Sequence, residues 1–255
     1  MAHYVLILGG GQGIRLNNKI PKQFLELKGM PIIMHSVNAF LKSDPKSHIY
    51  IGLPKNYISK WSSLIKKYNF HINHTVFIGG QTRSETVYLG IQRIVQDNKS
   101  CVEDIISIHD GARPFIDSTF ISDLISNAKK YGGSVPVLSL KNALIRNIIP
   151  TSTRNTKKNH STNRQNYKIT QTPQIFNLQE IETCYSQLYD LISKEENIES
   201  ILSNIFDDLS VYEKFKETQK SSTYFVCGRE YNIKITTPMD YYMAPYIYDF
   251  FTSIT

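Results

Sequence analysis

The 255-residue sequence has few cysteines, a single tryptophan and no long uninterrupted apolar run. Its three cysteines, Cys101, Cys184 and Cys227, lie far apart and form no CxxC pair, which argues against a disulfide framework and against a zinc site. No window reaches the apolar length of a membrane-spanning helix, and the N-terminus lacks the basic-then-apolar pattern of a signal peptide. We therefore expect a cytoplasmic protein with reduced thiols and no membrane partner.

Acidic residues are outnumbered, with 22 aspartates and glutamates against 29 lysines and arginines, so the formal net charge is +7. Such a balance is typical of proteins that bind nucleic acid, a membrane surface or small phosphorylated ligands. The basic residues are scattered except in RNTKKNHSTNR, residues 154–164, whose polar composition predicts an exposed loop or arm. No aromatic residues alternate with these cations and no nucleic-acid-binding module accompanies them, so a nucleic-acid partner is not favoured.

Apolar runs of strand length alternate with stretches of helical spacing through the first 140 residues. Strands are predicted at 4–10, 48–54, 74–80 and 134–140 and in the strand-and-loop segment 104–115, and helices at 32–43, 61–68, 84–96 and 118–132. In the last of these helices, Ser118 is a candidate N-cap and Gly132 a candidate C-cap. This alternation predicts an α/β fold with a Rossmann-like, mostly parallel sheet and helices on both faces.

The pattern weakens from about residue 140 to 170, which suits an inserted extended arm. Beyond it, 167–176 predicts a strand and a turn, 178–194 a helix, and the C-terminal segment two short strands and a helix that begins near Pro238. There is no internal repeat and no domain linker. We therefore expect a single domain over 1–255, with an arm at roughly 140–170.

A glycine-rich loop follows the first predicted strand, in LILGGGQGIRLNNKIPKQFLEL, residues 6–27. Glycines at the carboxyl end of a strand let backbone N–H groups approach an anion closely. Alone the pattern also fits a plain turn, and it is neither a P-loop nor a complete dinucleotide-binding fingerprint. Arg15 and Lys22 follow closely, and although either could be a surface cation, two cations suit a transition state loaded with negative phosphate oxygens.

Two further strand-to-loop junctions, 79–83 and 110–113, are expected at the same sheet edge, where ligands bind in such folds. Asp110 ends an apolar strand, where a lone carboxylate needs a partner such as a metal ion or Arg113. We expect His109 beside it to be structural or to form a hydrogen bond at the strand end. No GxSxG elbow supports a hydrolase triad.

Six motifs occur in order: GGGQGIRL…PKQF, GGQTRSETV, HDGARPF, NRQNYKITQTPQIF, DDLSVYE and NIKITTPMD. Together they resemble the 2-C-methyl-D-erythritol 4-phosphate cytidylyltransferases, from residue 4 to about 245. The ribitol-5-phosphate cytidylyltransferases, a sister group, share most of these motifs. The resemblance implies a nucleotidyltransferase that uses Mg²⁺ to convert CTP and a polyol phosphate to a CDP-polyol and pyrophosphate, without a covalent enzyme intermediate.

The resemblance also implies a role for individual residues. Arg15 and Lys22 match the pair that stabilises the transition state, and Arg164 and Lys234 match the pair that positions the attacking phosphate. Implied nucleotide contacts are Gly9, Gly10, Gly11, Gly13, Gly80, Gln81, Arg83, Thr86, Asp110 and Ala112. Implied contacts to the second substrate are Arg113, Arg164, Thr172, Asp207, Asp208 and Lys234. Asp110 matches the carboxylate on the Mg²⁺ side, and because the family's arm arginine comes from the neighbouring subunit, a homodimer through the arm is expected.

The chain departs from the family pattern on the polyol side. Leu140 or Ala143 stands where the family has a threonine, and Phe206 stands where a threonine often precedes the aspartate pair. The segments 147–163 and 193–205 look longer than is typical. CTP chemistry is therefore better supported than the identity of the polyol.

Other motifs, including HDGARPF, look more like the methylerythritol group than the ribitol group. We therefore expect synthesis of 4-diphosphocytidyl-2-C-methyl-D-erythritol, in non-mevalonate isoprenoid biosynthesis. Two alternatives stay open: a ribitol-5-phosphate or other polyol-phosphate enzyme for cell-wall or capsule polymers, and a nucleotide-binding protein without turnover.

Overall fold

The protein is described by a computed structural model that covers residues 1–11, 21–98, 101–145, 161–194, 201–203, 205–216 and 222–255. The strands are β1 (His3–Leu8), β2 (Glu26–Leu27), β3 (Met30–Pro31), β4 (His48–Leu53), β5 (His74–Ile78), β6 (Ile105–Asp110), β7 (Gly132–Ser139), β8 (Leu144–Ile145), β9 (Ser161–Thr162), β10 (Lys168–Thr170), β11 (Gln174–Asn177) and β12 (Ser222–Cys227). The α-helices are α1 (Ile32–Ser43), α2 (Ile58–Lys67), α3 (Arg83–Asp97), α4 (Ser118–Tyr131), α5 (Leu178–Lys194), α7 (Asp208–Phe215) and α8 (Pro238–Ile254). Short 3₁₀ turns are η2 (Lys22–Phe24), η3 (Lys55–Tyr57) and η4 (Arg164–Asn166).

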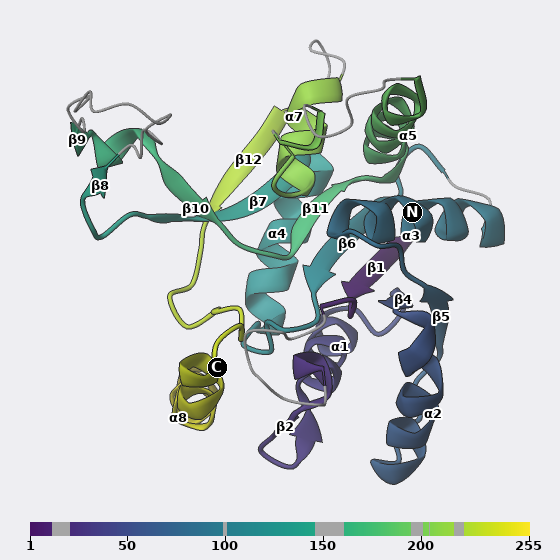
Figure 1. Cartoon of the computed structure of the whole chain (residues 1–255), viewed down its shortest axis with the longest axis vertical. Helices are drawn as coiled ribbons and strands as arrows, with labels where there is room; N and C mark the ends of the chain where they lie inside the picture. The colour runs from purple at the N-terminus through teal and green to yellow at the C-terminus, as the bar shows by residue number, and fades with distance from the viewer. Residues whose placement is uncertain (12–20, 99–100, 146–160, 195–200, 204, 217–221) are drawn as a thin grey trace, which may run out of the picture.

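Eight strands form the central sheet, in the order β10-β7-β11-β6-β1-β4-β5, with β12 also paired to β7 (Figure 1). The β1–β4, β1–β6, β4–β5 and β7–β12 pairs are parallel, whereas β10 and β11 run antiparallel to β7. The mostly parallel sheet predicted from the sequence is therefore confirmed. The carboxyl ends of β1, β4, β5 and β6 meet at one edge.

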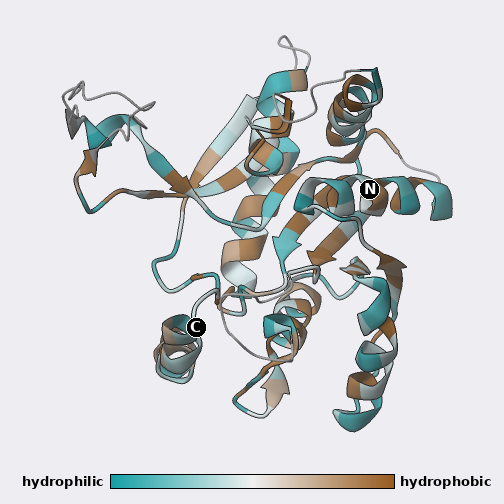
Figure 2. Cartoon of the chain, in the orientation of Figure 1, coloured by the Kyte–Doolittle hydropathy of each residue, from teal (hydrophilic) through white to brown (hydrophobic). Residues whose placement is uncertain are grey.

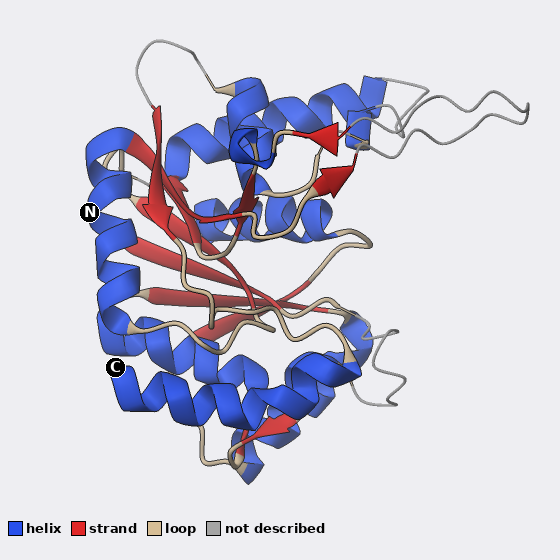
Figure 3. Cartoon of the chain, turned by 90° about the vertical axis from the view of Figure 1, so that its left-hand side faces the viewer, coloured by secondary structure: helices blue, strands red, loops and turns tan. Residues whose placement is uncertain are grey.

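Alternate residues of the strands supply two separate cores, one on each face of the sheet. On one face Val5 and Ile7 pack with α1, α2 and α4, and on the other Leu6 packs with α3, α5 and α7. Figure 3 shows helices on both sides of the strands, and Figure 2 shows hydrophobic strands at the centre with helices of mixed colour around them. A third cluster places α8 against Phe115 and Ile235.

Most predicted elements form as expected, and the helices 32–43 and 178–194 match α1 and α5 residue for residue. The N-cap of α4 is Asp117 rather than Ser118, because the Asp117 carboxylate accepts a hydrogen bond from the N–H of Phe120 at 2.7 Å. Gly132 is the C-cap, at a φ of 94° that favours glycine.

The predicted second strand near the C-terminus is wrong, since residues 232–236 lie in no strand. The N–H of Ile235 donates to the carbonyl of Ala112 at 2.9 Å, in the loop after β6. This segment therefore runs beside a loop instead of along a strand.

The arm expected at roughly 140–170 begins after β7, where β8 and β9 pair as a separate two-stranded ribbon. In Figure 1 this ribbon lies away from the central sheet, and β10 leads back to it. The middle of the arm, 146–160, lies outside the described residues. None of the helices in the described part of the chain is long and apolar enough to cross a membrane.

Candidate functional site

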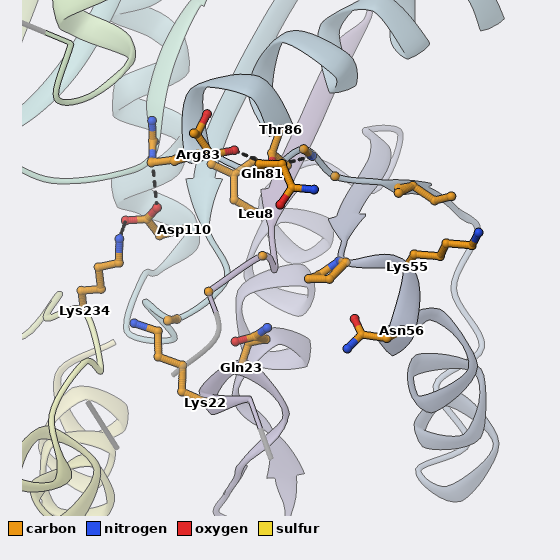
Figure 4. Close-up of a pocket in the computed structure, with 18 of the residues that line it drawn as sticks. Leu8, Lys22, Gln23, Lys55, Asn56, Gln81, Arg83, Thr86, Asp110 and Lys234 are labelled. Carbon is orange, nitrogen blue, oxygen red and sulfur yellow. Dashed lines mark hydrogen bonds and ion pairs between the residues drawn. The ribbon is translucent and has the colours of Figure 1, made fainter. Parts of the chain in front are cut away.

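A cleft of about 1330 Å³ opens at the carboxyl ends of β1, β4, β5 and β6 (Figure 4). Its lining residues come from six separate parts of the chain: Leu8, Gly10, Gly11, Lys22, Gln23, Pro54, Lys55, Asn56, Ile78, Gly79, Gly80, Gln81, Thr82, Arg83, Thr86, Asp110, Ala112, Lys234 and Thr236. The strand ends that the sequence predicted as a ligand site are thus gathered around one space.

The glycine loop leaves β1 at a point where a side chain would not fit. The N–H of Gly9 donates to the carbonyl of Gly52 at 2.9 Å, and a Cβ on Gly9 would lie 2.5 Å from the side chain of Leu53. The amide of Gln23 donates to the carbonyl of Gly9 from the other side. Gly10 and Gly11 then line the cleft, whereas the predicted site residues Gly13 and Arg15 lie outside the described part of the chain.

Lys22 is buried, with 8 % of its surface exposed, and opens η2 beside the glycine loop. Phe24, at the end of the same turn, packs against Trp61 in the core, which anchors the turn. Figure 4 shows the side chains of Lys22 and Lys234 extending into the same part of the cleft, from segments more than 200 residues apart.

The turn between β5 and α3 is fixed by its own side chains. Thr82 caps α3 by accepting the N–H of Glu85 at 3.0 Å, and the Glu85 carboxylate accepts the N–H of Gln81 at 2.7 Å. The hydroxyl of Thr86 accepts the N–H of Gly80 at 3.1 Å and donates to the carbonyl of Thr82 at 2.9 Å. The turn is therefore rigid, and Figure 4 shows Gln81 on the cleft side of it.

Three cations surround Asp110 at the end of β6. Its Oδ2 is 3.0 Å from Nζ of Lys234 and 3.4 Å from Nε of Arg113, and its Oδ1 is 3.4 Å from Nε of Arg83. Burial by itself would raise the pKa of this carboxyl, but the three neighbouring cations lower it well below the usual range. Asp110 is therefore ionised at every physiological pH, and the cluster keeps a net positive charge for an anionic ligand.

Arg83 joins Asp110 to helix α7, which packs on the same face of the sheet as α3. Its Nη1 and Nη2 bind the two carboxylate oxygens of Asp208 at 2.9 and 2.7 Å, and Oη of Tyr185 donates to Asp208 at 2.7 Å. Asp208 has no exposed surface. This places the predicted substrate residue Asp208 behind the cleft, as the partner of Arg83.

The neighbouring Asp207 is the N-cap of α7 and is half-buried. Its carboxylate accepts hydrogen bonds from the N–H of Ser210 at 3.0 Å, the hydroxyl of Thr170 at 2.8 Å and the amide of Gln174 at 2.8 Å. Asp207 borders a smaller cavity of about 220 Å³, which Arg83 also lines, and does not line the main cleft. Phe206 beside it is 80 % exposed.

His109 and Thr172 form a buried network behind Asp110. The carbonyl of Arg113 is 3.0 Å from Nε2 of His109 and needs a donor, so Nε2 carries the proton and Nδ1 accepts from the Thr172 hydroxyl at 3.1 Å. That hydroxyl accepts the N–H of Asp110, also at 3.1 Å. Burial lowers the pKa of His109 to about 4, so the ring is neutral and structural, as expected.

Arg164 is the predicted site residue that lies furthest from the others. It begins η4 on the arm, is exposed, and donates to the carbonyl of Lys141. It does not line the cleft of its own chain. The structure therefore gathers Lys22, Lys234 and the predicted nucleotide-binding residues that it describes around one cleft. Arg113 and Thr172 contact Asp110. Arg164 lies apart from all of these residues.

Sequence reasoning missed several cleft residues, among them Gln23, Lys55 and Asn56. Gln23 stands inside the PKQF motif, next to Lys22. Lys55 and Asn56 follow β4 directly, so the rule that ligands bind beyond the carboxyl ends of parallel strands offered a signal for them.

Asp110 is the only acid among the described residues that line the cleft. Across the described part of the chain, no group of three or more His, Cys, Asp or Glu residues could hold a metal ion. The protein therefore offers no built metal cage here. A single carboxylate fits Mg²⁺ only where substrate phosphates and water supply most of the ligands.

No serine or cysteine lines the described part of the cleft, so chemistry through a Ser or Cys nucleophile has no candidate there. The cleft presents the exposed backbone of the glycine loop, the rigid turn before α3 and an excess of positive charge. These features suit the binding and transfer of a phosphorylated nucleotide. The fold and this cleft define the protein as an α/β nucleotidyltransferase.

Comparison with known proteins specifies the family. The family model for 2-C-methyl-D-erythritol 4-phosphate cytidylyltransferase, IspD, matches residues 3–249. A relative of that name from Azobacteroides pseudotrichonymphae genomovar. CFP2 is 35% identical over 246 residues, which cover 96% of this chain and 98% of the relative. Another, from Phocaeicola vulgatus, is 31% identical, with the same coverage. The chain belongs to the 2-C-methyl-D-erythritol 4-phosphate cytidylyltransferase family.

Solved structures agree in fold. The crystal structure of 4-diphosphocytidyl-2C-methyl-D-erythritol synthase from Anaerococcus prevotii DSM 20548 superposes with a TM-score of 0.73 at 21% identity, over 97% of this chain and 96% of that one. The cytidylyltransferase structure from Francisella tularensis gives a TM-score of 0.72 at 22% identity, over 97% and 100% of the two chains.

Proposed function

We propose that this chain transfers the cytidylyl group of CTP to 2-C-methyl-D-erythritol 4-phosphate, which gives 4-diphosphocytidyl-2-C-methyl-D-erythritol and pyrophosphate. The observation that carries the proposal is the convergence of Lys22, Asp110 and Lys234, from three distant segments, on one cleft with Gly10 and Gly80. Relatives named for this activity match the chain over nearly its whole length.

The reaction exchanges one bond at phosphorus. An oxygen of the polyol phosphate bonds to the α-phosphorus of CTP, and the bond from that phosphorus to the oxygen bridging to the β-phosphate breaks. Pyrophosphate leaves with the electron pair of the broken bond. The attacking phosphate is already ionised, so no general base is required, and the protein contributes position and positive charge.

In this proposal the glycine loop holds the triphosphate and the turn 79–83 holds the nucleoside. Lys22, with Arg15 by family resemblance, stabilises the charge that develops at the α-phosphorus and the leaving group. Lys234 lines the cleft and holds the attacking phosphate, with Arg113 beside it on the same oxygen of Asp110.

We place Mg²⁺ with the triphosphate, where it neutralises phosphate charge when bound. Asp110 is the only carboxylate lining the described cleft, and three cations already surround it. Asp110 would hold the ion together with phosphate oxygens of CTP, and the ion would supply further neutralisation of the phosphate charge.

We also propose a cytoplasmic homodimer in which the arm of one chain completes the cleft of the other. Arg164 supports this arrangement, since it is exposed on the arm and does not line the cleft of its own chain. Two cations from different subunits then face one polyol phosphate, namely Arg164 of the partner subunit and Lys234.

The test is pyrophosphate release by the purified protein with Mg²⁺, with CTP, ATP, GTP and UTP each crossed with methylerythritol phosphate, erythritol phosphate and ribitol-5-phosphate. We expect turnover with CTP and methylerythritol phosphate, at least about 100-fold above any other pair in kcat/KM. A preference for ribitol-5-phosphate would assign the chain to the sister activity. CTP binding without pyrophosphate release from any pair would show a nucleotide-binding protein without turnover.

A further inference from the structure

Lys234 lies in a segment without regular structure, between the end of β12 at Cys227 and the start of α8 at Pro238. The segment opens with a tight turn at 229–232, closed by a hydrogen bond of 3.0 Å from the N–H of Asn232 to the carbonyl of Arg229. No strand or helix holds this turn, so other contacts must fix the backbone position of Lys234.

Gln171 makes three of those contacts, next to the bond from the N–H of Ile235 to the carbonyl of Ala112 and the bond from the amide of Asn232 to the carbonyl of Thr172. It is buried, with 4 % of its surface exposed, and its amide nitrogen donates to the carbonyl of Arg229 at 2.8 Å and to that of Asn232 at 3.1 Å. Its amide oxygen accepts the N–H of Arg229 at 3.0 Å. Both amide N–H groups and the amide oxygen of Gln171 thus form hydrogen bonds with the backbone of the turn. A Cβ on Gly228 would lie 2.5 Å from that oxygen, so the approach requires glycine there.

The same turn holds a second cation of the site. The carbonyl of Asn232 also accepts Nη1 of Arg113 at 2.8 Å, while Nε of Arg113 lies 3.4 Å from Asp110. Nζ of Lys234, two residues after Asn232, is 3.0 Å from the same oxygen of Asp110. The carbonyl of Asn232 therefore connects Gln171 to two of the three cations beside Asp110, Arg113 and Lys234.

We infer that Gln171 is a positioning residue for the second substrate: through the turn 229–232 it sets Lys234 and Arg113 against the incoming polyol phosphate. The inference rests on the proposed function, which gives those two cations that task. Gln171 directly follows β10, the strand that returns from the arm, so it couples the root of the arm to Lys234 by three hydrogen bonds.

Two variants test this role. Gln171→Met keeps the volume and removes all three hydrogen bonds, and Gln171→Glu keeps the oxygen but places a carboxylate against two carbonyls. We expect Gln171→Met to raise KM for methylerythritol phosphate about 10-fold or more and to change the Kd for CTP less than about twofold. Gln96→Glu, on the exposed end of α3, controls for the added charge and should leave both constants unchanged.

A double variant separates positioning from general damage. If Gln171 acts through Lys234 and Arg113, adding Gln171→Met to Lys234→Ala should raise KM for the polyol phosphate by a smaller factor than it does in the wild type, because only Arg113 is left for it to position. Additive losses would overturn the inference. So would equal rises in the constants for both substrates, which would mark Gln171 as merely structural. The measurements on Gln171→Met can be interpreted even if Gln171→Glu does not fold.

A measurement without turnover keeps this inference distinct from the proposed function. Lysine amines are labelled with acetic anhydride and read by peptide mass spectrometry. We expect Lys234 to react several-fold faster in Gln171→Met than in the wild type, because its place against Asp110 loosens, while Lys66 on α2 reacts equally in both. Unchanged labelling would overturn the inference even in an active enzyme. If the wild type released no pyrophosphate from any pair, the proposed function would fail, and faster labelling would still support the contact between Gln171 and the Lys234 turn.

Discussion

At the scale of a single residue, the proposed function assigns the stabilisation of the transition state to Lys22, which lines the cleft beside the glycine loop. Removing one preorganised donor to a transition-state oxygen lowers kcat by about 100- to 1000-fold. We expect Lys22→Ala to lose kcat by at least that factor, while its thermal unfolding and its Kd for CTP stay near those of the wild type. Steady-state kinetics, calorimetry and CTP titration check these three outcomes.

Lys66→Ala is the matched control for Lys22→Ala, since Lys66 is exposed on α2 and lines no part of the cleft. It should keep wild-type kinetics. A Lys22→Ala enzyme that retained most of its kcat would contradict the mechanism proposed for the cleft.

Three buried histidines, His3, His35 and His109, have a lowered pKa and predict how stability depends on pH. Burial lowers the pKa of His3 and of His109 to about 4, from an ordinary value of 6.5. Between those values the unfolded chain binds protons that the folded chain does not, so stability falls as the pH drops from about 6.5 to 4. Each histidine contributes up to about 1.4 kcal/mol per pH unit inside that window.

His109→Gln keeps a donor and an acceptor beside Thr172 and Arg113 but binds no proton in this range. We expect the slope of unfolding free energy against pH between 6.5 and 4 to fall by the share that His109 contributes, while the shares of His3 and His35 remain. Urea unfolding at a series of pH values measures it. His71→Gln, at an exposed site, should leave the slope as it is. An unchanged slope in His109→Gln would mean that His109 is already protonated in the folded protein.

At the scale of elements, the Arg83–Asp208 pair fastens α7 to the N-terminus of α3, across the face of the sheet that α5 also covers. Asp208→Asn leaves a buried guanidinium without its charged partner, and breaking such a pair costs about 3–5 kcal/mol. We expect a loss of that size in the free energy of unfolding, measured in urea. Asp190→Asn, exposed on α5, should change it by less than about 0.5 kcal/mol. A similarly small loss in Asp208→Asn would show that water replaces the pair readily.

Elements that follow local rules could be predicted from the sequence. The helices at 32–43 and 178–194 have clear apolar spacing, and the strands before the cleft end in glycine or proline. The predicted strand at 232–236 failed because its pattern of alternating residues reflects two other demands. Ile235 fills the core under α8, and the carbonyl of Asn232 serves Arg113 and Gln171.

The candidate site could likewise be predicted from the sequence only in part. Motifs brought Lys22, Gly80, Asp110 and Lys234 to one sheet edge, because the ends of parallel strands converge there. The sequence did not show that Asp208 points inward to Arg83, or that Gln171 holds the Lys234 turn. Those contacts join residues that lie 125 and about 60 positions apart, and no local pattern encodes them.

At the scale of the whole molecule, the arm decides whether one chain makes a complete site. Arg164 lies on the arm, outside the cleft of its own chain. If the proposed homodimer forms through the arm, then Lys22→Ala damages the cleft of the chain that carries it, whereas Arg164→Ala damages the cleft of its partner. The two variants should therefore complement each other.

Co-expression of Lys22→Ala and Arg164→Ala chains with different tags allows the mixed dimer to be purified. In that dimer, one cleft carries both defects and the other carries neither, because the chain with intact Lys22 receives the intact arm. We expect roughly half of the wild-type kcat per dimer, with a wild-type KM for the polyol phosphate, although each variant alone is impaired. Each variant purified as its own homodimer is the control. If Arg164 served its own chain, each cleft of the mixed dimer would keep one defect, and the mixture would show only the average of two impaired enzymes.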